Sequence, residues 1–280
     1  MNSIKKMMLS GALGCLISGM AYADGSSPQP VKPYWQDIQV VAVNKEKPRS
    51  SFMSYADRET ALTSRFEKSP YYSLLNGTWK FFFVDSYKDL PQNITDPSVN
   101  TSSWDDITVP GNWEVQGHGV AIYTNHGYEF KPRNPQPPLL PEANPVGVYR
   151  RDIEIPASWD NRDIYLHIGG AKSGLYVYLN GKEVGYSEDS KNPAEFLINK
   201  YLQPGKNVLT LKIFRWSTGS YLECQDFWRM SGIERDVFLW SQPKASIQDF
   251  RVVSTLDDTY TNGIFKLAVD LRIIPKKRKI

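Results

Sequence analysis

The chain contains little cysteine, little histidine and almost no net charge. Its 280 residues include two cysteines and three histidines, and the formal net charge is +3. A nearly balanced charge argues against nucleic acid as a partner. Cys15 lies in an N-terminal segment that we expect to be removed, which leaves Cys224 alone. An internal disulfide is then excluded, and the stability of the fold has to come from packing.

Several recurring catalytic motifs are also missing. The sequence has no glycine-rich phosphate loop and no Gly-x-Ser-x-Gly motif, and its histidines are not spaced as metal ligands of one element. Acidic pairs do occur, at Glu188 and Asp189 and at Glu223 and Asp226. Glycoside hydrolysis uses two carboxylates, but most acidic pairs in loops are solvated or shape turns. These pairs by themselves do not assign a reaction.

Long apolar runs are absent after the first 23 residues, so we expect no membrane span there. At the N-terminus two lysines precede an apolar stretch (7–20), and the small-x-small sequence AYA follows it and ends at Ala23. This pattern is typical of a secretory signal peptide. We therefore expect residues 1–23 to be cleaved off near Ala23 and the protein to be periplasmic or secreted. Lipid attachment at Cys15 is the less favoured alternative, because the residues before it match the lipoprotein pattern poorly.

Aromatic side chains and short alternating strands, by contrast, are abundant. The chain holds 8 Trp, 16 Tyr and 12 Phe. In GLYVYLNGKEVGYS, alternation places Leu175, Val177 and Leu179 on one face, and Asn180-Gly181 suits the type I′ turn of a hairpin. Many such strands joined by Gly, Pro and Asn turns predict an all-β fold, an antiparallel sandwich or jelly roll. Short helices are expected only near 57–68 and at 195–201.

The predicted organisation has four parts. They are a signal peptide (1–23), an extended leader (24–50), a jelly-roll domain (51–243) and the start of a second sandwich (244–280). Two strands, SIQDFRVVSTL and GIFKLAVDL, follow Pro243, whereas an immunoglobulin-type sandwich has about seven. We therefore expect this last part to be a truncated immunoglobulin-like domain. Because the basic end RIIPKKRKI fits the preceding strand poorly, we hypothesise that residues 272–280 result from a shifted reading frame, which the downstream coding DNA would test.

Three loop segments combine aromatic rings with amides and carboxylates. They are VPGNWEVQGHGVAIYTNHGY, VGYSEDSKNPAEF and YLECQDFWRMSG. Aromatic rings stack on the apolar faces of sugars, while amides and carboxylates bind the hydroxyls. The residues alone therefore indicate an aromatic-rich β domain with loops suited to a sugar.

Together with LNGTWKF and NPVGVYRRDIEIP, these segments resemble the amino-terminal domain of β-galactosidases of glycoside hydrolase family 2. The resemblance runs in unbroken order from about Tyr71 to Leu271. LNGTWKF is shared across the family, including β-glucuronidases and β-mannosidases, whereas GSYLECQDFWRMSGIERDV points to the β-galactosidase branch. The resemblance implies a galactose-binding-like jelly roll that packs against a later (β/α)8 barrel and lends loops to its active site.

The resemblance also implies roles for two residues. Asn125 and Asp226 resemble residues that contact the galactose, and Asp226 also resembles a ligand of a sodium ion, for which carboxylate oxygen is suitable. Structural alternatives stay open, because Asn125 could shape a turn and Asp226 could pair with Arg229. We expect Trp228 and Arg229 to pack and anchor rather than bind.

The implied reaction is hydrolysis of terminal β-D-galactosides with retention. In the family, the acid/base and nucleophile glutamates and the magnesium ligands lie in the barrel, so we assign no catalytic residue here and expect no turnover by this chain alone. The implied partners are a β-galactoside and that barrel. The alternatives are a stand-alone carbohydrate-binding module, a structural domain, and a β-glucuronidase or β-mannosidase.

Overall fold

The computed structural model describes residues 32–130 and 134–272. The expected signal peptide, Cys15 and residues 273–280 lie outside the described residues. The described part is almost entirely β-structure with one short α-helix, so the predicted all-β fold is confirmed. No helix among the described residues is long and apolar enough to cross a membrane.

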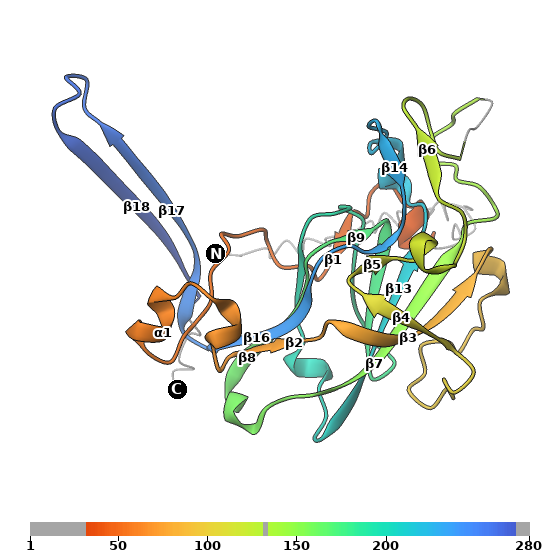
Figure 1. Ribbon diagram of the computed structural model, residues 1–280, viewed down its shortest axis with the longest axis horizontal. Helices are drawn as coiled ribbons and strands as arrows, with labels where there is room; N and C mark the ends of the chain where they lie inside the picture. Colours follow the sequence, from red (N-terminus) through yellow and green to blue (C-terminus); the bar gives the residue numbers. More distant parts are fainter. Residues whose placement is uncertain (1–31, 131–133, 273–280) are drawn as a thin grey trace, which may run out of the picture. The chain divides into compact units, whose positions relative to one another are not determined.

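Two antiparallel sheets form a sandwich (Figure 1). Within the described residues, the larger sheet has the strand order β1-β11-β10-β13-β7-β3-β4 and the smaller one β12-β8-β16-β2. The larger sheet consists of β1 (Ala42–Val43), β3 (Gly77–Val84), β4 (Asp105–Val109), β7 (Val146–Glu154), β10 (Gly174–Leu179), β11 (Lys182–Ser187) and β13 (Lys206–Phe214). The smaller sheet consists of β2 (Tyr72–Leu74), β8 (Arg162–Ile168), β12 (Ala194–Leu197) and β16 (Val237–Pro243).

Shorter elements connect and flank these sheets. A three-stranded sheet contains β5 (Gly111–Asn112), β15 (Gly232–Ile233) and β9 (Ala171–Lys172), and two further pairs are β6 (Ile122–Thr124) with β14 (Phe227–Arg229) and β17 (Ser246–Leu256) with β18 (Gly263–Arg272). The 3-10 helices are η1 (Tyr34–Gln36), η2 (Phe66–Lys68), η3 (Tyr87–Asp89), η4 (Glu114–Gln116), η5 (Ala157–Trp159), η6 (Asn199–Tyr201) and η7 (Thr218–Tyr221).

The main core lies between the two large sheets, and period-two alternation fills it. Val177 of β10 and Leu211 of β13 share a buried cluster with Leu166 of β8 and Leu239 of β16, and all four are 0% exposed. Full burial of such a side chain contributes about 1.5–3 kcal/mol. The predicted inward face of the GLYVYLNG hairpin is therefore confirmed, and this packing contributes to the stability of the sandwich.

The two helix predictions had different outcomes. Near 57–68, α1 (Arg58–Leu62) forms as expected, and the Asp57 side chain caps it by accepting a hydrogen bond from the backbone N–H of Thr60 at 2.7 Å. The helix expected at 195–201 is wrong in its first half, where β12 pairs with β8 and only η6 is helical. Phe196 and Ile198 are two residues apart and almost fully buried, so a strand buries both on one face where a helix would separate them.

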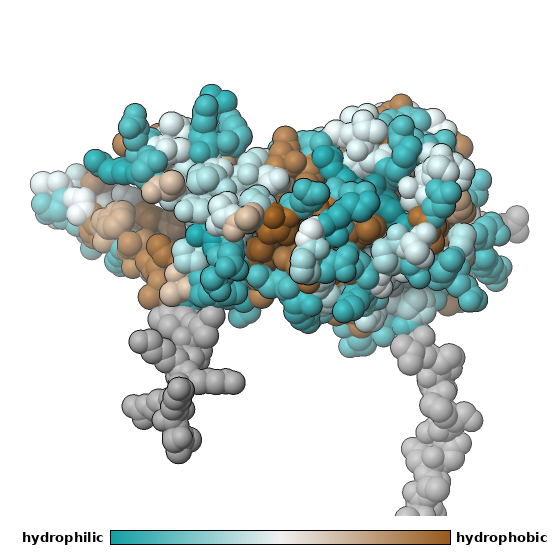
Figure 2. Space-filling view, turned by 90° about the horizontal axis from the view of Figure 1, so that it is seen from below, coloured by the Kyte–Doolittle hydropathy of each residue, from teal (hydrophilic) through white to brown (hydrophobic). Residues whose placement is uncertain are grey.

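The β17–β18 hairpin follows the sandwich, with β16 ending at Pro243 and β17 beginning at Ser246. Its register places Val252 opposite Leu267 and Phe250 opposite Val269, so these side chains share one face. Hydrophobic residues of the hairpin are visible at the left of Figure 2, and Leu267 is 55% exposed. In the described residues this apolar face is not buried in a core.

Candidate functional site

The two residues with implied sugar contacts lie on the β6–β14 ribbon, which Figure 1 shows beyond one end of the sandwich. Phe227 pairs with Thr124, and the antiparallel register continues to Arg229 and Ile122. Asn125 directly follows β6, and Asp226 directly precedes β14. The fold therefore brings both to the same end of the ribbon, although they are about 100 residues apart in the sequence.

The exposed face of this ribbon carries aromatic and polar groups side by side. Tyr123 and Trp228 are directly paired, their ring centroids are 5.6 Å apart, and each residue is 54% exposed. The Tyr123 hydroxyl donates a hydrogen bond of 2.8 Å to Asp226 Oδ1, and this bond raises the pKa of Tyr123. Asn125 Oδ1 lies 2.7 Å from His126 Nδ1. An exposed carboxylate, an amide and two rings thus occupy one small area, as sugar recognition requires.

The structural alternative for Asp226 is not seen in the described residues, where Asp226 and Arg229 form no ion pair. Arg229 is 1% exposed and donates instead to the backbone carbonyl of Glu223 at 2.5 Å. The prediction that Arg229 anchors the loop is therefore confirmed. The same prediction for Trp228 stays a prediction: its ring is 54% exposed on the outer face of the ribbon and packs against Tyr123.

A buried guanidinium holds the other end of the ribbon. Arg215 directly follows β13 and is 3% exposed. Its Nη2 donates to the carbonyl oxygen of Val120 at 2.9 Å and to that of Arg229 at 3.2 Å, so one side chain binds both strand segments at their base. The carboxylates of Glu114 and Glu129 each lie 3.7 Å from Arg215 and balance its charge. A two-stranded ribbon is marginal by itself, and these bonds stabilise it.

The two glutamates connect this base to the rest of the domain. Glu129 pairs with Lys172 at 2.9 Å, and both side chains are almost fully buried. Glu114 accepts hydrogen bonds from the backbone N–H of Ser231, just after β14, at 2.9 and 3.0 Å. Burial raises the pKa of Glu114, although the Ser231 bonds and the charge of Arg215 oppose this shift. The ribbon base is therefore a buried ionic cluster, and the tip is exposed.

The buried members of the acidic pairs are hydrogen-bonded to neighbouring loops and strands. Glu188 accepts hydrogen bonds from Tyr186 at 2.8 Å and from Thr218 at 2.6 Å, and Glu223 accepts one from the backbone of Ser190 at 3.1 Å. Burial raises the pKa of both carboxyls. These contacts stabilise loops.

Sequence reasoning overlooked Tyr123 as a residue of the candidate site. Its spacing of two from Asn125 is the strand signal that indicates a shared face.

The donor chemistry near Asp226 suits a sodium ion only in part. Carboxylate, phenol and amide oxygens gather at the ribbon tip, and hard cations prefer oxygen. No group of three or more His, Cys, Asp or Glu that could hold a metal occurs within the described residues. Asp226 could therefore supply one carboxylate ligand to such an ion, without a cluster of further His, Cys, Asp or Glu ligands beside it in the described part of the chain.

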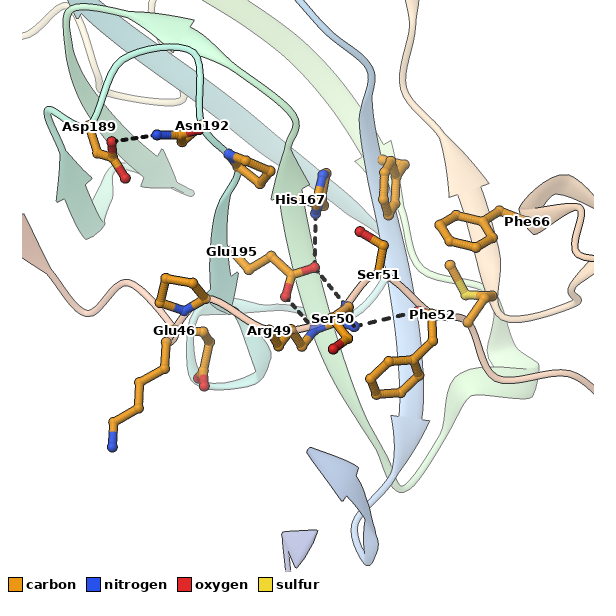
Figure 3. A pocket seen from close by; sticks show the side chains of 15 residues that line it. Glu46, Arg49, Ser50, Ser51, Phe52, Phe66, His167, Asp189, Asn192 and Glu195 are labelled. Carbon is orange, nitrogen blue, oxygen red and sulfur yellow. Dashed lines mark hydrogen bonds and ion pairs between the residues drawn. The ribbon is translucent and has the colours of Figure 1, made fainter. Parts of the chain in front are cut away.

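A second concave region lies on the outer face of the smaller sheet (Figure 3). It is a cavity of about 260 Å³ between the segment 46–53 and residues of β8, β12 and β16. At its floor Glu195 accepts two hydrogen bonds of 2.9 Å from Arg49, and His167 Nδ1 lies 2.8 Å from the same carboxylate. The Arg49 guanidinium lies over the Trp240 ring at 4.3 Å. Nothing in the local sequence indicated this pair, because Arg49 and Glu195 lie in distant segments.

Comparison with known proteins defines the class of this sandwich. Residues 72–243 match the family model described as "Glycosyl hydrolases family 2, sugar binding domain". The chain belongs to this family, which confirms the resemblance found in the sequence. It is 40% identical over 242 residues to a β-galactosidase of Priestia megaterium and 38% identical over 237 residues to one of Psychromonas ingrahamii. Each match covers 85% of this chain, which spans only 23% and 22% of those relatives.

Solved structures of glycosidases share the fold. A β-glycosidase from Bacteroides vulgatus has a TM-score of 0.55 at 23% identity, covering 74% of this chain and 25% of that one. A β-glucuronidase of an uncultured Clostridium species has a TM-score of 0.53 at 21% identity, covering 72% and 34%. At these identities the likeness concerns the β-sandwich fold.

Proposed function

We propose that this chain is the sugar-binding part of a β-galactosidase that hydrolyses terminal β-D-galactosides with retention. The supporting observation is the ribbon, which brings Asn125 and Asp226 together at an exposed tip beside two aromatic rings. The name shared by the curated relatives supports galactose as the sugar. Asn125 and Asp226 contact the sugar in this proposal, and Asp226 supplies one oxygen ligand to a sodium ion.

The proposal assigns bond cleavage to another part of a longer protein. Retaining hydrolysis needs two carboxyl groups about 5–5.5 Å apart, one as acid/base and one as nucleophile. In our proposal a catalytic barrel provides this pair together with the magnesium ligands, and the ribbon forms one wall of its pocket. The purified chain should then release no product from a chromogenic β-galactoside, and activity that copurifies with the protein would contradict this.

A chimeric enzyme tests the sugar contacts. Residues 72–243 of this chain would replace the matching segment of the Priestia megaterium β-galactosidase, and kcat/KM would be measured on β-galactoside and β-glucuronide substrates. We expect galactoside activity and a loss of about 10- to 100-fold for Asp226→Ala, since hydrogen bonds to charged groups are the stronger ones. Asp105→Ala, at an exposed position of β4, is the matched control. Equal activity of the two variants, or preference for the glucuronide, would contradict the proposal.

A stand-alone carbohydrate-binding module is the second candidate, favoured by the description of the matching family model. It differs in one measurable respect, because the isolated chain would then bind a galactoside through Asp226 without a barrel. Export is a further part of our proposal. Mass spectrometry of the protein from the periplasm or medium should find Asp24 at the N-terminus.

A further inference from the structure

We propose that the cavity on the outer face of the smaller sheet is a second binding site, for one neutral sugar ring. It is separate from the ribbon, because the segment 46–53 and strands β8, β12 and β16 form it, whereas the ribbon belongs to β6 and β14. Its volume of about 260 Å³ is just below the range of about 300–1,000 Å³ that is typical of pockets for drug-sized ligands. This size suits a single ring and not an oligosaccharide.

The polar side chains at the floor of the cavity already have hydrogen-bond partners within the protein. Glu195 is 7% exposed, and its carboxylate receives Arg49, His167 and the Trp240 indole N–H at 3.1 Å. His167 is further fixed by stacking on Phe238, with ring centroids 4.2 Å apart and an interplanar angle of 15°. Side chains held in this way present a preformed surface to a ligand, which lowers the entropy lost on binding.

The walls combine aromatic rings with available polar atoms. Phe52, Phe66 and Phe238 line the cavity, and Figure 3 shows the first two on the side opposite Glu195. Among the described residues, neither Ser51 Oγ nor His167 Nε2 has a hydrogen-bond partner, although both residues line the cavity. A sugar ring offers an apolar C–H face for such rings and hydroxyls for such polar atoms.

The charged residues around the cavity favour a neutral ligand over an ionic one. Arg49 is neutralised by Glu195, Asp189 lies 3.2 Å from Lys45, and Glu46 lies 3.7 Å from Arg272. Of the charged residues lining the cavity, the exposed Lys47 is without an ion-pair partner in the described part of the chain. An ionic ligand would therefore find little unpaired charge, and a wholly apolar one would cover Ser51 and His167 without bonding them, which is unfavourable.

Methyl resonances of the full chain test the proposal. Met53 lines the cavity and is 8% exposed, so its 13C-labelled methyl group reports on ligand entry. Titration with methyl β-D-galactoside should shift this resonance with a Kd of about 1–10 mM, the affinity expected for so few ligand atoms. Methyl β-D-glucuronide, the charged counterpart, should cause no saturable shift.

Three variants locate the site. Phe66→Leu keeps an apolar wall without the ring, and Ser51→Ala removes one exposed hydroxyl; each should weaken binding by about 3- to 10-fold. Asp226→Ala should leave the Met53 shift unchanged, so a failure of the ribbon proposal and a failure of this one are distinguishable. The proposal is overturned if the Met53 resonance does not move, if the glucuronide shifts it equally, if Asp226→Ala abolishes the shift, or if both cavity variants bind like the unaltered chain.

Discussion

Replacing Arg215 by Met should destabilise the domain more than any change at the ribbon tip. Methionine keeps the aliphatic bulk but removes the guanidinium that bonds Val120 and Arg229 and neutralises Glu114. Breaking a buried ion pair by removing one partner costs about 3–5 kcal/mol, because the remaining charge stays buried. The total free energy of unfolding of a native protein is about 5–15 kcal/mol, so this loss is a large share of the stability.

The destabilisation should also depend on pH, in a direction that Glu114 determines. Burial already raises the pKa of this carboxyl above 4.5, and losing the opposing charge of Arg215 raises it further. A carboxyl whose pKa is higher in the folded than in the unfolded state contributes to stability at pH values below its unfolded pKa. That contribution is lost as the pH rises through the folded pKa. The stability deficit of Arg215→Met should therefore be smallest near pH 4.5 and should grow toward neutral pH.

Urea unfolding over this pH range measures the deficit, and amide hydrogen exchange locates it. Exchange should accelerate in β6 and β14 before it does in β7 and β13. The matched control is Lys80→Met, which removes a cation from an exposed pair with Asp106 at 2.8 Å and should cost less than about 1 kcal/mol. A pH-independent deficit for Arg215→Met that is no larger than that of the control would refute the reasoning.

Three further predictions concern other parts of the chain. Burial alone would raise the pKa of Glu195, but its hydrogen bonds to His167 and Arg49 outweigh this effect and lower the pKa below 4.5. The Arg49–Glu195 bonds that hold segment 46–53 should therefore persist above pH 4.5 and weaken as pH falls further. The measurement is proteolysis near residue 50, which should become faster at low pH and should already be fast at neutral pH in Glu195→Gln. Asp226→Asn should lower the pKa of Tyr123 toward 10, measured by ultraviolet titration against the same variant with Tyr123→Phe, and an unchanged titration would contradict the bond. Gly185→Ala should destabilise by at least about 1–3 kcal/mol in thermal unfolding, because its Cβ would meet a backbone oxygen of β1 and lie 2.7 Å from Phe196; a neutral effect would show that the strand yields.

The strands of the sandwich followed from alternation in the sequence. Leu175, Val177 and Leu179 were expected on one face, and all are nearly fully buried. Asn180-Gly181 was expected to turn the hairpin, and both residues have positive φ, 53° and 76°. These features are local, so the sequence alone determines them. The helix expected at 195–201 failed because pairing with a distant strand overrode a short stretch of ambiguous pattern.

The residues alone indicated which loops suit a sugar, but the two contact residues were predictable only through the family resemblance. That resemblance selected Asn125 and Asp226, and the structure adds that they lie at one end of one ribbon. The groups that hold the ribbon could not be read from the sequence. Arg215 bonds to backbone carbonyls up to 95 residues away, and a carbonyl carries no side-chain signal. The Arg49–Glu195 pair was hidden for the same reason, since its members are 146 residues apart.

The division of the ribbon into a buried base and an exposed tip has a consequence for protein engineering. Charges at the base fix the backbone, while Tyr123, Asn125, Asp226 and Trp228 at the tip contribute little to the core. Surface substitutions of this kind usually change stability by less than about 0.5 kcal/mol. A library randomised at these four positions would therefore consist mostly of folded proteins, so the proposed sugar contacts could be varied without first stabilising the scaffold.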